Sequence, residues 1–225
     1  MKPLLRVAAV LAVATALLLP YRNAGAYAHF GGQPKWGGAP VASGSGGNVT
    51  YHFNVVGTPD MPGGPATLDG EWTVLTDALN DWEVATGGNL DFEYGGTTTN
   101  TLSSGDGTNT TWWNEASAAP SGVLATAYTS TSGGTIITAD VVFDADDHTW
   151  SSVPLMRHVA LHEYGHTLGM AHSTVSPSIM YFSVGSPLAG LQADDIAGAI
   201  ALYGDGGGPG DGVTGGPPPP PPPPP

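Results

Sequence analysis

The spacing of apolar residues along the chain predicts a mixture of helices and strands. Between residues 71 and 85, apolar side chains recur at helical spacing and a glycine follows at position 87, which is typical of an amphipathic helix. Two further helices are expected at residues 154–168 and 192–203, and Asp194 and Asp195 suit the positively polarised start of the second one. Short β-rich or alternating runs predict strands at residues 49–55, 90–94, 123–129 and 136–143.

Three segments lack such periodicity. Residues 95–122 are mostly Gly, Thr, Ser and Asn and predict a long surface stretch, and residues 29–47 predict an irregular arm. Residues 205–225 are dominated by Gly and Pro and end in a proline run, which predicts a flexible tail. That tail is a plain linker, a spacer to something beyond, or a ligand for a proline-binding module. Residues 48–204 are left as one candidate domain.

The first 28 residues have the pattern of a secretory signal peptide. Lys2 and Arg6 are followed by an uncharged apolar run over residues 7–19, which is short for a membrane span. Residues 24–26 and 26–28 both read Ala-x-Ala, the small-residue pattern of a cleavage site. The alternative is an uncleaved N-terminal anchor. The pattern therefore predicts a secreted, extracellular protein.

Composition narrows the possible partners. The 225 residues include 5 Lys plus Arg and 19 Asp plus Glu, for a formal net charge of −14. So few basic residues disfavour nucleic acid and anionic membranes as partners. There is no cysteine, so a disulfide framework, a thiol nucleophile and a cysteine metal site are excluded. Any transition metal must be bound by His or carboxylate side chains. We expect a monomer.

The sequence HEYGHTLGMAH, residues 162–172, carries the candidate chemistry. His162 and His166 lie at i and i+4 on a predicted helix, so both rings project from one face, as two zinc ligands require. Glu163 follows the first ligand and can reach water at the metal. Gly169 permits a sharp turn that brings His172 back as a third ligand. Three neutral imidazoles leave a fourth position open for water, as in catalytic zinc sites.

Two less specific interpretations compete with this one. The histidines could be ordinary surface residues of a helix, or the zinc site could be structural or inactive. The presence of Glu163 favours a catalytic site. The motif HExxHxxGxxH resembles the signature of the metzincin zinc peptidases, and further segments are similar to the matrixin branch: Met180 in SIMY, and residues 72–87, 139–150 and 191–204.

The resemblance implies an α+β fold of the metzincin type. Such a catalytic domain has a twisted mixed β-sheet, two long helices, a zinc cleft, and a C-terminal subdomain with the Met-turn and the last helix. The resemblance covers residues 48–204. Without cysteine, the thiol-based latency of animal matrixins cannot operate, which suggests a secreted microbial member. The runner-up, a serralysin-like branch, would need a tyrosine where Phe182 stands.

The resemblance also implies an activity and residue roles. The protein would be a zinc-dependent endopeptidase of extracellular or matrix proteins, with Glu163 as general base and then general acid. Met180 would form a packing floor beneath the zinc, and Tyr181 would line the pocket for the residue after the cut. The strand at residues 136–142 would lie along the cleft and pair with substrate through an open edge. Phe182 stands where many matrixins have Pro, which leaves the pocket shape open.

Other metal sites follow the same resemblance. Val142 occupies the position of a His that binds a second, structural zinc in vertebrate matrixins, so one zinc is expected. Asp144 and Asp147 match acidic positions that bind calcium, and carboxylates suit that ion. The alternative is a solvated acidic loop. His148 and His158 are assigned to the surface or to positions that support the site.

Two other functions compete with the endopeptidase assignment. One is a secreted surface or binding protein with a catalytically inactive zinc site. The other is a zinc hydrolase that acts on a non-peptide bond.

Overall fold

A five-stranded sheet and three helices dominate the described part of the chain. The computed structural model describes residues 27–37, 47–64, 68–101, 106–114, 122–146 and 148–204, together with the backbone of residues 5–6. In chain order the elements are β1 (Leu5–Arg6), β2 (Ala28–His29), β3 (Gly47–Asn54), α1 (Glu71–Ala85), β4 (Leu90–Thr98), β5 (Asn109–Asn114), β6 (Ala125–Ser132), β7 (Thr135–Asp144), α2 (Val153–Thr167), β8 (Met170–Ala171), β9 (Ser183–Val184) and α3 (Ala193–Tyr203).

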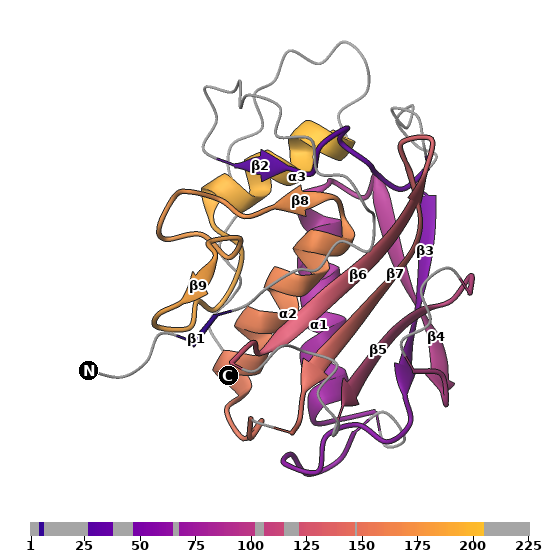
Figure 1. Ribbon diagram of the computed structural model, residues 1–225, viewed down its shortest axis with the longest axis vertical. Coiled ribbons are helices and arrows are strands. Elements are labelled where there is room, and N and C mark those ends of the chain that lie inside the picture. The colour runs from indigo at the N-terminus through magenta and orange to yellow at the C-terminus, as the bar shows by residue number, and fades with distance from the viewer. Residues whose placement is uncertain are drawn as a thin grey trace.

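The main sheet has the strand order β4-β3-β5-β7-β6. The first four strands are parallel to one another, whereas β6 runs antiparallel to β7 and forms one edge. Two short pairs, β2 with β8 and β1 with β9, lie outside this sheet. Figure 1 shows α1 and α2 side by side against one face of the sheet, with α3 beside β2 and β8. The expected α+β class with a mixed sheet is confirmed.

The core lies between the sheet and the helices α1 and α2. The helical period at residues 71–85 buries one stripe of α1, and Trp82 is fully buried in it. The indole Nε1 of Trp82 donates a hydrogen bond of 2.9 Å to the carbonyl of Leu161 on α2. From the sheet, Tyr51 and Phe53 are also fully buried. This packing fixes α2, which carries the candidate metal ligands, against a rigid support.

The prediction of a loop over residues 95–122 was wrong in two places. β4 continues to Thr98, and Asn109–Asn114 forms β5 in the interior of the sheet. The threonines of β5 read as loop residues because they are polar, but their branched Cβ suits a strand. Thr111 is fully buried, and its hydroxyl meets the hydroxyl of Tyr164 at 3.0 Å, which satisfies both groups inside the core.

The helix boundaries agree with the predicted ones to within about one residue, a normal uncertainty for helix ends. Ser152 precedes α2 but makes no side-chain cap; its carbonyl accepts the N–H of Met156 at 3.0 Å. α3 begins with a capping box between Gln192 and Asp195. Among the described residues, no helix combines the length and apolarity that a membrane crossing requires.

The arm before the sheet is more ordered than expected. Ala28–His29 forms β2, which pairs with β8 immediately after α2. Trp36 is buried, and its Nε1 donates to the carbonyl of Thr167 at the end of α2, 2.9 Å away. The ammonium of Lys35 reaches the carbonyl of Leu202 on α3 at 3.1 Å. The arm therefore connects the ends of α2 and α3 beside the candidate site.

Candidate metal centre and active site

Helix α2 and the turn after it bring three histidines together. His162 and His166 lie one turn apart on α2, and Gly169 reverses the chain with a φ of 97°. A Cβ at Gly169 would overlap the carbonyl oxygen of Pro34, so both the dihedral and the packing require glycine there. β8 then leads back to His172. One ligand nitrogen from each of the three histidines lies within 4.8 Å of the other two.

Backbone carbonyls orient two of these rings. Nδ1 of His162 lies 2.7 Å from the carbonyl oxygen of Ile179, and Nδ1 of His166 lies 2.8 Å from that of Met170. A carbonyl only accepts, so each Nδ1 carries the proton and each Nε2 presents a lone pair. The two Nε2 atoms are 3.0 Å apart and face each other. Two lone pairs at that distance repel unless a cation lies between them.

The donor set therefore fits a divalent metal such as zinc. A tetrahedral zinc with nitrogen ligands at about 2.05 Å separates those nitrogens by roughly 3.3 Å, close to the spacing seen here. Nε2 of His172 is buried and finds no hydrogen-bond partner among the described residues, so a third donor is available. The carbonyls that hold Nδ1 of His162 and His166 are the outer contacts that metal-binding imidazoles commonly make.

Burial keeps the three imidazoles neutral. It lowers the pKa of His162 well below its usual value, and the neighbouring His166 lowers it further. Burial, with His172 nearby, lowers the pKa of His166 to about 3. The pKa of His172 is lowered by burial as well. A neutral imidazole is the form that binds a metal, so the site is prepared for one at neutral pH.

Glu163 is a buried carboxyl beside the triad. Its side chain is fully buried, and within the described chain neither carboxyl oxygen makes a hydrogen bond of good geometry. Burial raises the pKa of Glu163 well above its usual range, and the backbone amide of Ala127 on β6 opposes this shift. A carboxyl held this way gains from taking up a proton. That property suits a group that takes a proton from water and returns it.

A turn at residues 178–180 lies beneath the triad, and the sequence analysis missed what holds it. Asp195 is fully buried, and its carboxylate accepts hydrogen bonds from the Ser178 hydroxyl at 2.5 Å and from the N–H of Ile179 at 2.8 Å. It also accepts the N–H of Met180 at 3.0 Å and that of Gln192 at 2.8 Å. Its position at the start of α3 suggested only an interaction with the helix dipole.

Met180 is fully buried and packs against α2 at Gly165. A Cβ on Gly165 would overlap the sulfur of Met180 and come within 2.9 Å of Cζ2 of Trp82. Position 165 therefore has no room for a side chain, because α1, α2 and the turn meet there. The role of Met180 as a packing floor beneath the histidines stays a prediction.

The strand that was expected to offer an open edge is not an edge strand. β7, which contains residues 136–142, is paired with β5 on one side and β6 on the other. The open edge next to α2 belongs to β6, which pairs only with β7 in the sheet. The two β-rich runs could not be ordered from sequence alone, since both alternate. The backbone of Ala127 on β6 lies beside Glu163, so the unpaired edge of the sheet adjoins that carboxyl.

The other predicted site residues have varied surroundings. Asp144 is buried at the end of β7, where its Oδ1 accepts the N–H of Asp146 at 3.0 Å; Asp147 lies outside the described residues. Tyr181 is partly buried and its ring lies 4.6 Å from that of Phe182. Val142, where a second zinc ligand was not expected, is fully buried within the sheet.

The two spare histidines also differ. His148 is half-buried with its ring 4.6 Å from that of Trp150. His158 is only 3% exposed. Of the two positions expected for it, at the surface or in support of the site, the surface position was wrong.

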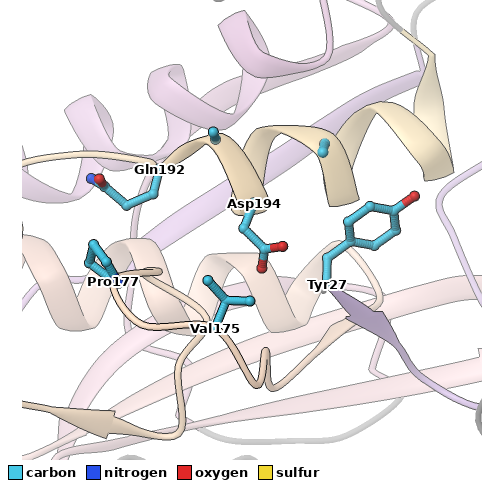
Figure 2. Close-up of a pocket in the computed structure, with 7 residues that line it drawn as sticks. Tyr27, Val175, Pro177, Gln192 and Asp194 are labelled. Carbon is cyan, nitrogen blue, oxygen red and sulfur yellow. The ribbon is translucent and has the colours of Figure 1, made fainter. Parts of the chain in front are cut away.

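A separate pocket of about 530 Å³ lies beside the start of α3 and includes none of the three histidines. Figure 2 shows Tyr27, Val175, Pro177 and Asp194 around it. Asp194 also accepts a hydrogen bond of 2.6 Å from the hydroxyl of Ser173, the residue after His172. This hydrogen bond links the lining of the pocket to the turn that carries His172.

These features together define a metallopeptidase-type domain. They are the mixed sheet, the helix with two histidines one turn apart, the third histidine after a glycine turn, and the buried glutamate beside them. Residues 47–204 match the matrixin family, and the chain belongs to that family. The members of this family are zinc metalloendopeptidases, and the grouping of the three histidines is able to bind a metal.

Individual relatives match over shorter stretches. The chain is 40% identical to a hatching enzyme of Paracentrotus lividus over 99 residues, which cover 41% of this chain and 16% of that protein. It is 39% identical to the neutrophil collagenase of Homo sapiens over 92 residues, 38% of this chain and 19% of that protein. It is 39% identical to metalloendoproteinase 2-MMP of Arabidopsis thaliana over 90 residues, 37% of this chain and 24% of that protein. The matched stretch thus spans at most about a quarter of each of these relatives.

Proposed function

We propose that the chain is a secreted zinc-dependent endopeptidase that hydrolyses peptide bonds of extracellular proteins. His162, His166 and His172 bind one zinc, and Glu163 is the catalytic base. The observation that carries the proposal is the pair of Nε2 atoms 3.0 Å apart, both with their protons fixed on the other ring nitrogen. A metal cation bound by both nitrogens would relieve the repulsion of their lone pairs, and a buried carboxyl without good hydrogen bonds lies next to them.

Glu163 performs the proton transfers. When bound, zinc polarises the scissile carbonyl and lowers the pKa of its water to about 7. Glu163 accepts a proton from the attacking water, which burial of its carboxyl favours. It then donates that proton to the nitrogen of the leaving amine. The carbonyls of Ile179 and Met170 keep the imidazoles in the orientation that the site needs.

An extended substrate pairs with the free edge of β6. This edge adjoins Glu163 through Ala127, and main-chain pairing with a sheet edge binds peptides without regard to most of their side chains. The residues after Met180 follow directly on Ile179, whose carbonyl contacts His162. Tyr181 then contacts the side chain that follows the scissile bond. Substrate selectivity therefore depends on residues 181–190.

The leader and the domain limits are also proposals. Residues 1–28 include the signal peptide and both candidate cleavage positions, and the limits proposed for the rest are 29–47 for the arm, 48–204 for the catalytic domain and 205–225 for the tail. Cleavage after Ala26 is favoured over cleavage after Ala28, because Ala28 pairs with Ala171 in β2 and β8. The intact mass of the secreted protein tests this directly, and it should correspond to a chain that starts at Tyr27.

Calcium at Asp144 and Asp147 remains a proposal of the family resemblance. If it binds, removal of calcium should lower the melting temperature of the wild-type protein but not that of Asp144→Asn. Metal analysis of the purified protein should find one zinc per chain. A second tightly bound zinc would contradict the argument from Val142.

Peptide-library digestion read by mass spectrometry tests the proposed activity. Wild-type protein should cut internal peptide bonds, a chelator should stop cleavage, and added zinc should restore it. Glu163→Gln keeps the size of the side chain but cannot take a proton, so it should bind zinc normally and lose about 10²–10⁴-fold in kcat/KM. Equal activity of both proteins would refute the mechanism. Zinc binding without any cleavage would favour an inactive site or a non-peptide substrate.

A further inference from the structure

We propose that Arg157 and His158, two neighbouring side chains of α2, clamp residues 188–189 and thereby position the segment 181–190 beside the metal centre. His158 is the main positioning residue. Its effect on substrate choice rests on the proposed peptidase function, whereas the clamp itself is a property of the fold. Neither residue is needed to bind the metal or to move a proton.

His158 holds the segment by accepting a backbone proton. Its Nδ1 accepts the N–H of Leu188 at 2.9 Å, so the ring proton must be on Nε2. The side chain is only 3% exposed, and its Nε2 has no hydrogen-bond partner within the described ranges. The ring therefore makes one directional contact, and that contact is with the segment.

Arg157 holds the next residue with the opposite polarity. Its Nε donates to the carbonyl of Ala189 at 2.9 Å. Its guanidinium is bound in turn to α1, through Asp81 at 2.7 Å and Asp77 at 3.7 Å. One helix thus offers an acceptor to residue 188 and a donor to residue 189. The N–H of Leu188 and the carbonyl of Ala189 are thus both hydrogen-bonded, as they would be beside a neighbouring β-strand.

The place of this clamp explains its effect. The segment starts at the turn under His162, where Ile179 contacts that ligand, and returns to α2 one turn earlier at His158. One helical turn is about 5.4 Å, so the segment runs alongside the ligand-bearing face. Between its two fixed ends lie Tyr181 and Phe182, the latter 49% exposed. Release of one end would move these aromatic rings relative to the metal.

A matched pair of substitutions tests the clamp. In His158→Asn the amide oxygen can occupy the place of Nδ1 and still accept the Leu188 N–H, whereas the amide of His158→Gln reaches only the place of Nε2. Hydrogen exchange of the Leu188 amide, followed by NMR, reads the contact directly. We expect protection in the wild type and in His158→Asn, and exchange faster by about tenfold in His158→Gln. Equal exchange in both variants would overturn the proposal.

Arg157→Gln provides a second test that does not alter a buried ring. It removes the Ala189 contact from a partly exposed position and should also accelerate exchange at Leu188, by about threefold. Unchanged exchange in this variant would show that the clamp does not involve Arg157. If His158→Gln failed to fold, the exchange rate of the Leu188 amide in Arg157→Gln would still test the clamp.

Kinetics then test the consequence for substrate. With peptides from the library, His158→Gln should keep kcat within about twofold and raise KM about five- to tenfold, with a changed preference for the residue after the cut. His158→Asn should behave like the wild type. A loss in kcat with KM unchanged would refute a positioning role. If no variant, nor the wild type, cleaves any peptide, the proposed function fails while the exchange data still decide the clamp.

Discussion

The buried carboxylate of Asp195 accepts the N–H of Ile179 at 2.8 Å, and the carbonyl of the same Ile179 holds Nδ1 of His162 at 2.7 Å. A side chain on α3 is thus connected to a candidate metal ligand on α2 through a single peptide residue. Asp195 also accepts three further donors, from Ser178, Met180 and Gln192. This carboxylate defines where the turn beneath the metal lies.

Asp195→Asn should therefore weaken both the fold and the metal site. The amide NH₂ would face donors that it cannot satisfy, which costs about 2–3 kcal/mol in the free energy of unfolding. Movement of Ile179 should reduce zinc affinity about 10–100-fold, as seen when outer contacts of metal ligands are lost. Denaturant unfolding of the metal-free protein and zinc titration against a competing chelator measure the two effects separately.

Asp194→Asn is the matched control, because Asp194 is adjacent but only partly buried, and its carboxylate accepts a hydrogen bond from the hydroxyl of Ser173. It should cost less than about 1 kcal/mol and leave zinc affinity within about threefold. If the two variants lose zinc affinity equally, the connection through Ile179 is not the cause.

Gly165→Ala should destabilise the protein although alanine favours helices. The new methyl group would overlap the Met180 sulfur and approach Trp82, so overpacking should cost about 1–3 kcal/mol. Combined with Met180→Ala, which removes the overlapping atom, the total cost should be smaller than the sum of the two single costs. Thermal denaturation of the single and double variants measures this coupling.

Gly185→Ala serves as the control for that substitution. No described atom lies within 4 Å of a Cβ built there, so its melting temperature should equal that of the wild type. A similar loss in Gly165→Ala and Gly185→Ala would mean that glycine is needed for the backbone and not for the packing against Met180.

The sequence predicted those features that depend on local patterns. The period of apolar residues located α1 and α3, and Gly169 marked the end of α2. The spacing of His162, His166 and His172 around that glycine anticipated their convergence. Helical geometry and a positive φ at glycine are local properties. They hold whatever the rest of the chain does.

Other features depend on tertiary contacts and left no local signal. The edge position of β6 follows from strand order, which alternation does not encode. The role of Asp195 requires that α3 meets the turn at residues 178–180. β5 was taken for loop because its threonines are polar, yet Thr111 is buried and paired with Tyr164. Such groups can be recognised only when their partners are known.

Phe30 should contribute to metal affinity from outside the segment that matches the matrixin family. Its ring stacks on that of His166, with 5.7 Å between the ring centroids, and its N–H donates to the carbonyl of Gly169 at 3.0 Å. Phe30→Ala would expose one face of a ligand to water and loosen β2. We expect zinc to bind about threefold to tenfold more weakly in a chelator competition. Phe182→Ala, which removes a half-exposed ring that lies tilted against the ring of Tyr181, should not change zinc affinity.

His29 should make the arm sensitive to acid. Burial lowers its pKa below the usual value of 6.5, and the hydrogen bond of Nε2 to the carbonyl of Gly198 opposes the shift only in part. Because the folded pKa lies below the unfolded one, protonation favours the unfolded state. The contribution of His29 to stability is therefore complete above about pH 6.5 and is lost as the pH falls towards the folded pKa.

In His29→Gln the amide can still donate to Gly198 but does not titrate. The melting temperature of the wild type, relative to that of His29→Gln, should fall between about pH 7.5 and pH 5. A difference that stays constant over this range would show that His29 does not couple the arm to pH.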